Sequence, residues 1–182
     1  MKHVFYLGTA IVLLLVSSCG ANKKTTLSDQ EIEAFTSKME GAKIHFVANV
    51  ANPLGTQAVN SVINSGLLPP GSNVGRIDLI GISNFLKIHG DSVSADLPYY
   101  GERQFGGGYN TTNIGITFDN AEVMTNLEFD SKKMAYRLQF QADAAAENYT
   151  VNGWLYPNGK ATIFINSSQR NTIGYMGTYT VK

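Results

Sequence analysis

A two-residue hydrophobic period runs through most of the chain after residue 43 and limits the fold more than any other feature. Ile44, Phe46, Ala48 and Val50 are separated by single intervening residues, a pattern that predicts a strand with one buried face. Similar segments follow to the end of the chain and together predict about eight to nine strands. The residues predicted to face inward in the later strands are Leu86, Ile88, Val93, Ala95, Leu97, Ile114, Ile116, Phe118, Val123, Leu127, Phe129, Met134, Tyr136, Leu138, Phe140, Ala161, Ile163, Ile165, Ile173, Tyr175, Tyr179 and Val181.

Short turn sequences separate these segments. Gly90-Asp91 has the composition of a tight hairpin turn, and Pro157-Asn158-Gly159 is a strong turn signal. Strands joined in this way pair antiparallel, so we predict a mainly β fold organised as an antiparallel meander. A sheet of this length folds into a sandwich or closes into a barrel, and a barrel of about eight strands is either filled by side chains or holds one small ligand.

Two further elements are expected beside the first strand. Ser28 and Glu31 have the spacing of a capping box, which predicts an N-terminal helix over residues 28–39. Residues 53–75 predict a short second helix or an irregular insertion. The apolar loop within this segment is a lid, a docking patch or a plug over one end of the domain, and we prefer the plug because exposed apolar patches are uncommon. Residues 28–182 are therefore expected to form a single β-barrel-like domain.

The N-terminus has the features of an export signal. An apolar run over residues 4–16 is too short to span a bilayer, and small residues precede Cys19. The stretch resembles a bacterial lipoprotein signal, which implies a signal peptide over residues 1–18, acyl chains such as palmitate on Cys19, and a tether through residue 27. The alternative is an ordinary signal peptide followed by a free cysteine. We expect a lipid anchor in a bacterial membrane, with the outer membrane favoured.

Charge and motif content exclude several functional classes. The formal net charge is zero, and the signs are mixed along the chain, so no nucleic-acid partner is expected. His45 and His89 are predicted to lie on polar faces, separated by most of the first sheet, and we predict no metal site and no cofactor. The sequence contains no GxSxG motif of serine hydrolases, no HExxH motif of zinc proteases and no phosphate-binding P-loop motif. An enzyme is therefore less favoured, although a hydrolase with dispersed carboxylates stays an alternative.

Residues 97–118 are the least ordinary stretch. They contain the candidate binding residues Tyr99, Tyr100, Arg103 and Tyr109, together with Glu102 and three consecutive glycines. Tyrosines beside an arginine are suited to binding a sugar, a peptide or another protein. In the structural alternative, one tyrosine caps the barrel and the glycines let a surface loop turn back.

Several short motifs, taken in order, resemble the domain-of-unknown-function family 4251 of Bacteroidetes-type envelope lipoproteins and secreted proteins. The motifs are Lys87-Ile88-x-Gly90-Asp91-x-Val93, Leu97-Pro98-Tyr99-Tyr100-Gly101, Tyr109, Ile116-x-Phe118, Asn158-Gly159-x-Ala161, Arg170 and Ile173-x-Tyr175-x-Gly177. The resemblance implies a lipocalin-like β-barrel and no assigned catalytic residues, and the chain departs from the family pattern at residues 54–75.

These observations predict a cell-envelope lipoprotein that serves as a non-catalytic binding or structural module, facing the periplasm or the cell surface. Its expected partners are the membrane, through the N-terminal lipid, and an unknown small molecule, glycan or envelope protein. The alternative is a carrier of a small apolar ligand in the barrel interior. Arg170 is expected to pair with Glu102 or Asp96. Asp91-Ser92-Val93 also matches a short pattern associated with bacterial O-glycosylation of Ser92, although turn chemistry alone explains Gly90-Asp91.

Overall fold

The computed structural model describes residues 27–56, 60–61, 68–104, 115–144 and 147–182. The predicted signal peptide, Cys19, most of the tether and Tyr109 lie outside these residues. In the part that is described, no helix is both long enough and apolar enough to cross a membrane.

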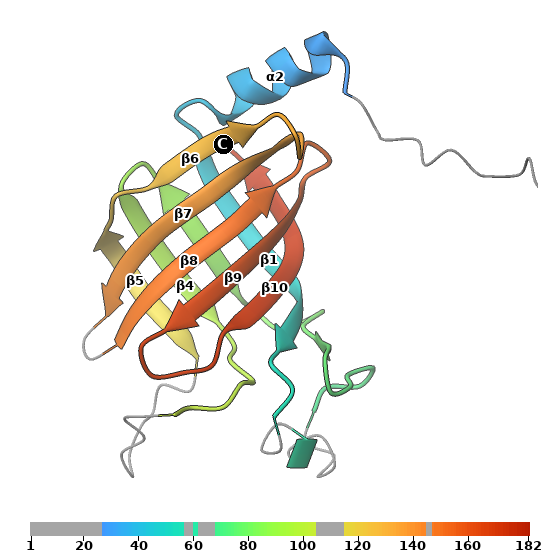
Figure 1. The fold of residues 1–182 in the computed structure, drawn as a ribbon, viewed down its shortest axis with the longest axis vertical. Coiled ribbons are helices and arrows are strands. Elements are labelled where there is room, and N and C mark those ends of the chain that lie inside the picture. The colour runs from blue at the N-terminus through green and yellow to red at the C-terminus, as the bar shows by residue number, and fades with distance from the viewer. Residues whose placement is uncertain (1–26, 57–59, 62–67, 105–114, 145–146) are drawn as a thin grey trace, which may run out of the picture.

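The helix α2 (Asp29–Met39) covers one end of the β structure (Figure 1). Its capping box is formed as predicted: the Ser28 hydroxyl accepts from the Glu31 amide at 3.3 Å, and the Glu31 carboxylate accepts from the Ser28 amide at 2.8 Å. Phe35 and Met39 are buried in the common core. Phe35 meets the ring of Tyr136 edge to face, with the centroids 5.3 Å apart, so the apolar stripe fastens the helix to the sheet.

All strands of the described residues belong to one antiparallel sheet. The strands are β1 (Lys43–Pro53), β2 (Ile77–Asp78), β3 (Phe85–His89), β4 (Ser92–Leu97), β5 (Ile116–Glu122), β6 (Asn126–Asp130), β7 (Ala135–Ala144), β8 (Glu147–Leu155), β9 (Lys160–Ser167) and β10 (Ile173–Val181). Their spatial order is β5-β4-β3-β1-β10-β9-β8-β7-β6, and the two-residue β2 pairs with β1.

The sheet curls into a half-barrel, with β6 to β9 in front of β4 and β5 in Figure 1. The first and last strands, β1 and β10, pair in the middle of the sheet, whereas its two ends, β5 and β6, are consecutive in the chain. This arrangement confirms the mainly β, antiparallel meander that the sequence predicts.

The predicted alternation explains most of the core. It is wrong at Met134, which lies in the turn before β7 with φ +51°, so that Ala135 is buried in its place, and Ile114 lies outside the described residues. Ile44 and Phe46 are 2% and 0% exposed, and Leu86 and Ile88 on the neighbouring strand are also buried. These buried residues of β1 and β3 form one hydrophobic cluster with the inward-facing residues of β8, β9 and β10. The predicted turn at residues 157–159 is present between β8 and β9, where Gly159 has φ +75° and its amide donates to the Tyr156 carbonyl at 3.1 Å. Gly90 and Asp91 join β3 and β4, as predicted.

The segment after β1 is only partly described. Asn60 and Ser61 are helical, and the neighbouring residues 57–59 and 62–67 lie outside the description. Leu68 is partly buried and packs against the core cluster.

One expectation about the sheet is wrong. His45 and His89 were expected to be separated by most of the first sheet, but they lie on neighbouring strands, because β3 pairs directly with β1. The register sets Lys43 opposite His89 and His45 opposite Lys87. The physical reason is that β2 is too short to separate the two strands and pairs only with the far end of β1.

Candidate functional site

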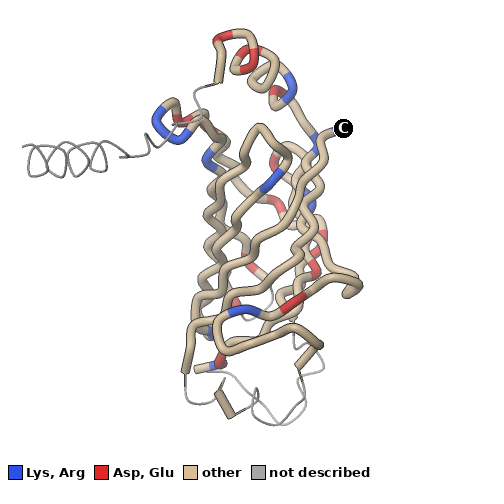
Figure 2. The backbone as a smooth tube through the Cα atoms, turned by 90° about the vertical axis from the view of Figure 1, so that its right-hand side faces the viewer, with Lys and Arg blue, Asp and Glu red and all other residues tan. Residues whose placement is uncertain are grey.

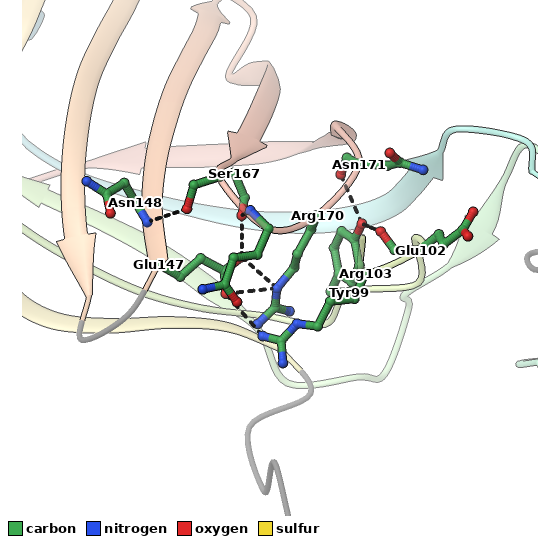
Figure 3. A network of polar contacts seen from close by, with 10 residues as sticks. Tyr99, Glu102, Arg103, Glu147, Asn148, Ser167, Arg170 and Asn171 are labelled. Carbon is green, nitrogen blue, oxygen red and sulfur yellow. Dashed lines mark hydrogen bonds and ion pairs between the residues drawn. The ribbon is translucent and has the colours of Figure 1, made fainter. Parts of the chain in front are cut away.

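A buried charged network closes the end of the half-barrel opposite α2 (Figures 1 and 3). Three connections meet there: residues 98–104 after β4, the start of β8 at Glu147, and residues 168–172 between β9 and β10. An isolated antiparallel bridge pairs Arg103 with Arg170 and thereby joins the first of these connections to the third. We call this arrangement the Glu147 clasp; it consists of Tyr99, Glu102, Arg103, Glu147, Ser167, Arg170 and Asn171.

Glu147 is the centre of the clasp. It is the first residue of β8 and is only 6% exposed, because the alternation of that strand turns it inward with Tyr149. The Arg170 Nε–H lies 2.8 Å from its Oε1, and a guanidinium nitrogen of Arg103 lies 3.1 Å from its Oε2. The Ser167 hydroxyl also donates to Oε1. One carboxylate therefore receives two guanidinium groups from different connections (Figure 3).

The electrostatics keep Glu147 ionised. Burial alone raises the pKa of Glu147, but the hydrogen bonds from Ser167 and Arg170, together with the positive charge of Arg170, outweigh burial and lower it. Two guanidinium groups contact the one carboxylate of Glu147, and the exposed Glu102 brings the formal charge of the clasp to zero. A carboxylate held in this way is a weak proton acceptor, so the arrangement is better suited to binding than to general base catalysis.

Backbone bonds fix the loop that carries Arg103. The amide of Gln104 donates to the Gln169 carbonyl at 2.7 Å, and the amide of Asn171 donates to the Glu102 carbonyl at 3.0 Å. The Tyr99 hydroxyl lies 2.9 Å from the carbonyl oxygens of both Glu102 and Asn171. Residues 98–104 are therefore tied to the β9–β10 connection on both sides of Arg103.

Two tyrosines, Tyr99 and Tyr175, pack next to the charged groups of the clasp and hold its backbone. The guanidinium carbon of Arg170 lies 5.0 Å from the centroid of the Tyr99 ring, a distance typical of cation–π contact. Burial raises the pKa of Tyr99 to about 12, although Arg170 opposes the rise. The hydroxyl of the fully buried Tyr175 donates to the carbonyl of Pro98, next to Tyr99 in the chain, at 2.9 Å. Both tyrosines thus remain neutral donors that hold the backbone of this loop.

The predicted binding residues have different positions. Tyr99 is 9% exposed and acts as a structural donor. Tyr100 is half-buried and packs against the core. Arg103 is also half-buried, and 24% of its side chain is accessible. Tyr109 lies outside the described residues. The structure thus brings Tyr99 and Arg103 into one network.

Sequence reasoning missed the acidic centre of the clasp. Arg170 was expected to pair with Glu102 or Asp96, but the carboxylate at its Nε is Glu147. A signal for Glu147 was available: it stands at an inward position in phase with Tyr149, Val151 and Leu155. A charged residue at such a position requires a buried partner. Over the described ranges, no group of three or more His, Cys, Asp or Glu side chains is arranged to hold a metal ion.

Comparisons with known proteins agree on one family. A family model described as "Domain of unknown function (DUF4251)" matches residues 26–179. A crystal structure of a DUF4251 family protein from Bacteroides eggerthii DSM 20697 is similar to this chain with a TM-score of 0.50 and 14% sequence identity, covering 82% of this chain and 87% of the other. At that identity the likeness concerns the fold alone. No curated protein matches the chain.

Proposed function

This chain belongs to the DUF4251 family, and from that premise we propose that it is a cell-envelope lipoprotein whose β domain is a non-catalytic binding module. The N-terminal sequence supports the first part, because an apolar segment and small residues precede Cys19. In this proposal Cys19 carries the lipid anchor in a bacterial membrane, preferably the outer one. The domain then faces the periplasm or the cell surface.

The exposed part of Arg103 is the observation that supports a binding role. Its guanidinium is held by Glu147 and by a loop that is fixed on both sides, so little side-chain entropy remains to be lost on binding. Among the described residues, Glu147 is its hydrogen-bonding partner, which leaves other N–H donors at the surface. A carboxylate, phosphate or sugar hydroxyl of a small molecule, glycan or envelope protein would fit these donors.

The position of the clasp suits a tethered module. In the sequence the tether directly precedes α2, and the clasp lies at the end of the strands opposite α2 (Figure 1). A short tether keeps the α2 end close to the membrane and presents Arg103 away from it. The clasp is therefore placed for a partner that is not the anchoring membrane.

Two observations favour a binding module over the alternatives. The inward rows of the described strands pack into one core that includes Phe46, Phe118, Phe140 and Tyr175, which argues against a roomy carrier interior. At the clasp, the two guanidinium groups on Glu147 argue against a hydrolase that needs a carboxyl pair with separate acid and base roles.

Native mass spectrometry of the protein extracted from the envelope tests this proposal. Arg103→Ala removes the exposed donors, and Arg76→Ala removes an exposed arginine elsewhere and serves as the matched control. We expect a copurifying molecule with the unaltered protein and with Arg76→Ala, and its loss with Arg103→Ala. The same bound mass in all three proteins, or none in any of them, contradicts binding through Arg103.

A further inference from the structure

A second charged feature lies on the outer face of the sheet, at the α2 end. A pocket of about 320 Å³ opens between β1, β3, β4 and the C-terminal residue. Lys43, His45, Lys87, His89 and Lys182 line it together with Ser92. In Figure 2, most of the Lys and Arg segments lie in the half of the molecule that carries α2 and the C-terminus.

The strand register explains why the basic side chains meet. On β1 and β3 the alternate residues Ile44 and Ile88 are buried, so their neighbours project from the outer face. Lys43 stands opposite His89, and His45 stands opposite Lys87. Two backbone hydrogen bonds of 3.1 Å pair Lys43 with Lys182 and bring the last residue to the same rim.

The lysine charges at the pocket have little compensation beyond one cation–π contact, in which the Lys87 Nζ lies 4.3 Å from the centroid of the Phe85 ring. The ammonium groups of Lys43, Lys87 and Lys182 have the same charge and repel one another across this pocket. Among the described residues, none of the three lysines that line the pocket forms an ion pair within 4.0 Å. The nearby carboxylate of Asp119 accepts a hydrogen bond from Ser94 at 3.0 Å.

We propose that this pocket binds a phosphate group. Ammonium groups with a neighbouring hydroxyl are typical phosphate ligands, and Ser92 supplies the hydroxyl. The volume is at the lower end of the roughly 300–1,000 Å³ range of small-ligand pockets, so the site admits a phosphate with part of the group that carries it. Bound phosphate relieves the repulsion among the basic side chains.

The phosphate has two sources, a lipid headgroup or a small soluble phosphate. If the protein is lipid-anchored, as proposed above, the α2 end is the end nearest the membrane, and the headgroup is then the nearer source. The pocket itself does not depend on that proposal, since its residues and register belong to the described domain.

The imidazole of His45 reports occupation of the pocket. Burial, followed by the charges of Lys87 and Lys182, lowers its pKa. The other charged or titratable groups in the pocket lining are Lys43 and His89. A bound anion opposes the charge effects, so the pKa of His45 rises when phosphate binds.

The test follows the His45 ring signals of the full-length protein by NMR in three settings. In the first setting the protein is in detergent, and inorganic phosphate is compared with chloride at equal ionic strength. In the second the protein is in nanodiscs of phosphatidylglycerol, and in the third it is in nanodiscs of phosphatidylcholine. A saturable rise in the His45 pKa with phosphate but not chloride identifies a phosphate site. A rise in the His45 pKa in phosphatidylglycerol nanodiscs, without a rise in phosphatidylcholine nanodiscs, identifies the anionic headgroup as a source of the phosphate. No rise in any setting, or equal responses to phosphate and chloride, overturns the proposal.

Variants distinguish phosphate binding in this pocket from nonspecific attraction of phosphate to surface lysines. Lys87→Ala and Lys182→Ala are expected to weaken the phosphate response about tenfold each, because each removes a charged hydrogen-bond donor. Lys160→Ala removes an exposed lysine that does not line the pocket and is the control. Equal weakening in all three variants contradicts a specific pocket. Chemical shifts elsewhere in the protein show that each variant is folded.

Discussion

Arg170 and Glu147 form a buried ion pair in which one guanidinium N–H reaches both carboxylate oxygens, at 2.8 and 3.1 Å. The two residues are 5% and 6% exposed. Their pairing joins the head of β8 to the β9–β10 connection, and Arg103 extends it to the loop after β4. Removal of either charge leaves the other buried without its main partner, which is far more destabilising than loss of a surface pair.

Glu147→Gln is therefore expected to lower the free energy of unfolding by about 3–5 kcal/mol, because the variant removes the carboxylate charge that pairs with the buried Arg170. Urea unfolding followed by circular dichroism measures the change. Glu122→Gln, an exposed carboxylate on β5, is the matched control and should change stability by less than about 0.5 kcal/mol. Similar small losses in both variants would show that the clasp contributes little.

The same pair predicts how stability depends on pH. The pKa of Glu147 is lowered in the folded protein, so its stabilising contribution is present above the unfolded pKa of about 4.3 and is lost as the pH falls through the folded value. The stability difference between the unaltered protein and Glu147→Gln should be constant near neutral pH and shrink below about pH 4. A difference that stays constant into that acid range contradicts the assigned pKa shift.

Tyr99→Phe removes the hydroxyl that bonds the Glu102 and Asn171 carbonyls. We expect a loss of about 1 kcal/mol and faster hydrogen exchange at the amides of Gln104 and Asn171, which pin the loop. Tyr156→Phe removes a hydroxyl outside the clasp and should leave both amides unchanged. Unchanged exchange in Tyr99→Phe would mean that the loop is held without this hydroxyl.

Gly177→Ala tests the pairing of the first and last strands. A Cβ at Gly177 would collide with the Val47 carbonyl oxygen and would stand 2.8 Å from the Ala48 Cα, both backbone atoms of β1. Overpacking of this kind should lower the free energy of unfolding by about 1–3 kcal/mol. Gly75→Ala is the control, because an added Cβ there meets no atom within 4 Å. Equal stability of the two variants would contradict the close approach of β1 and β10.

The sequence predicts the local structure of this protein better than its long-range contacts. Period-two alternation and the capping box determine the strands and α2, because both depend on residues that are neighbours in the chain. Glu147 and Arg170 lie on separate connections and meet only because β8, β9 and β10 bring their ends together. The basic pocket was missed for the same reason, since it depends on β3 pairing directly with β1.

Membrane fractionation of the unaltered protein and Cys19→Ser tests the central claim most directly. The proposed orientation, with α2 near the membrane and Arg103 facing away from it, depends on lipid at Cys19. We expect the unaltered protein in the membrane fraction with an acylated N-terminus by mass spectrometry, and Cys19→Ser without acyl groups and outside that fraction. A Cys19→Ser protein that still sediments with membranes, or an unaltered protein without acyl groups, contradicts the claim that this chain is a lipid-anchored module.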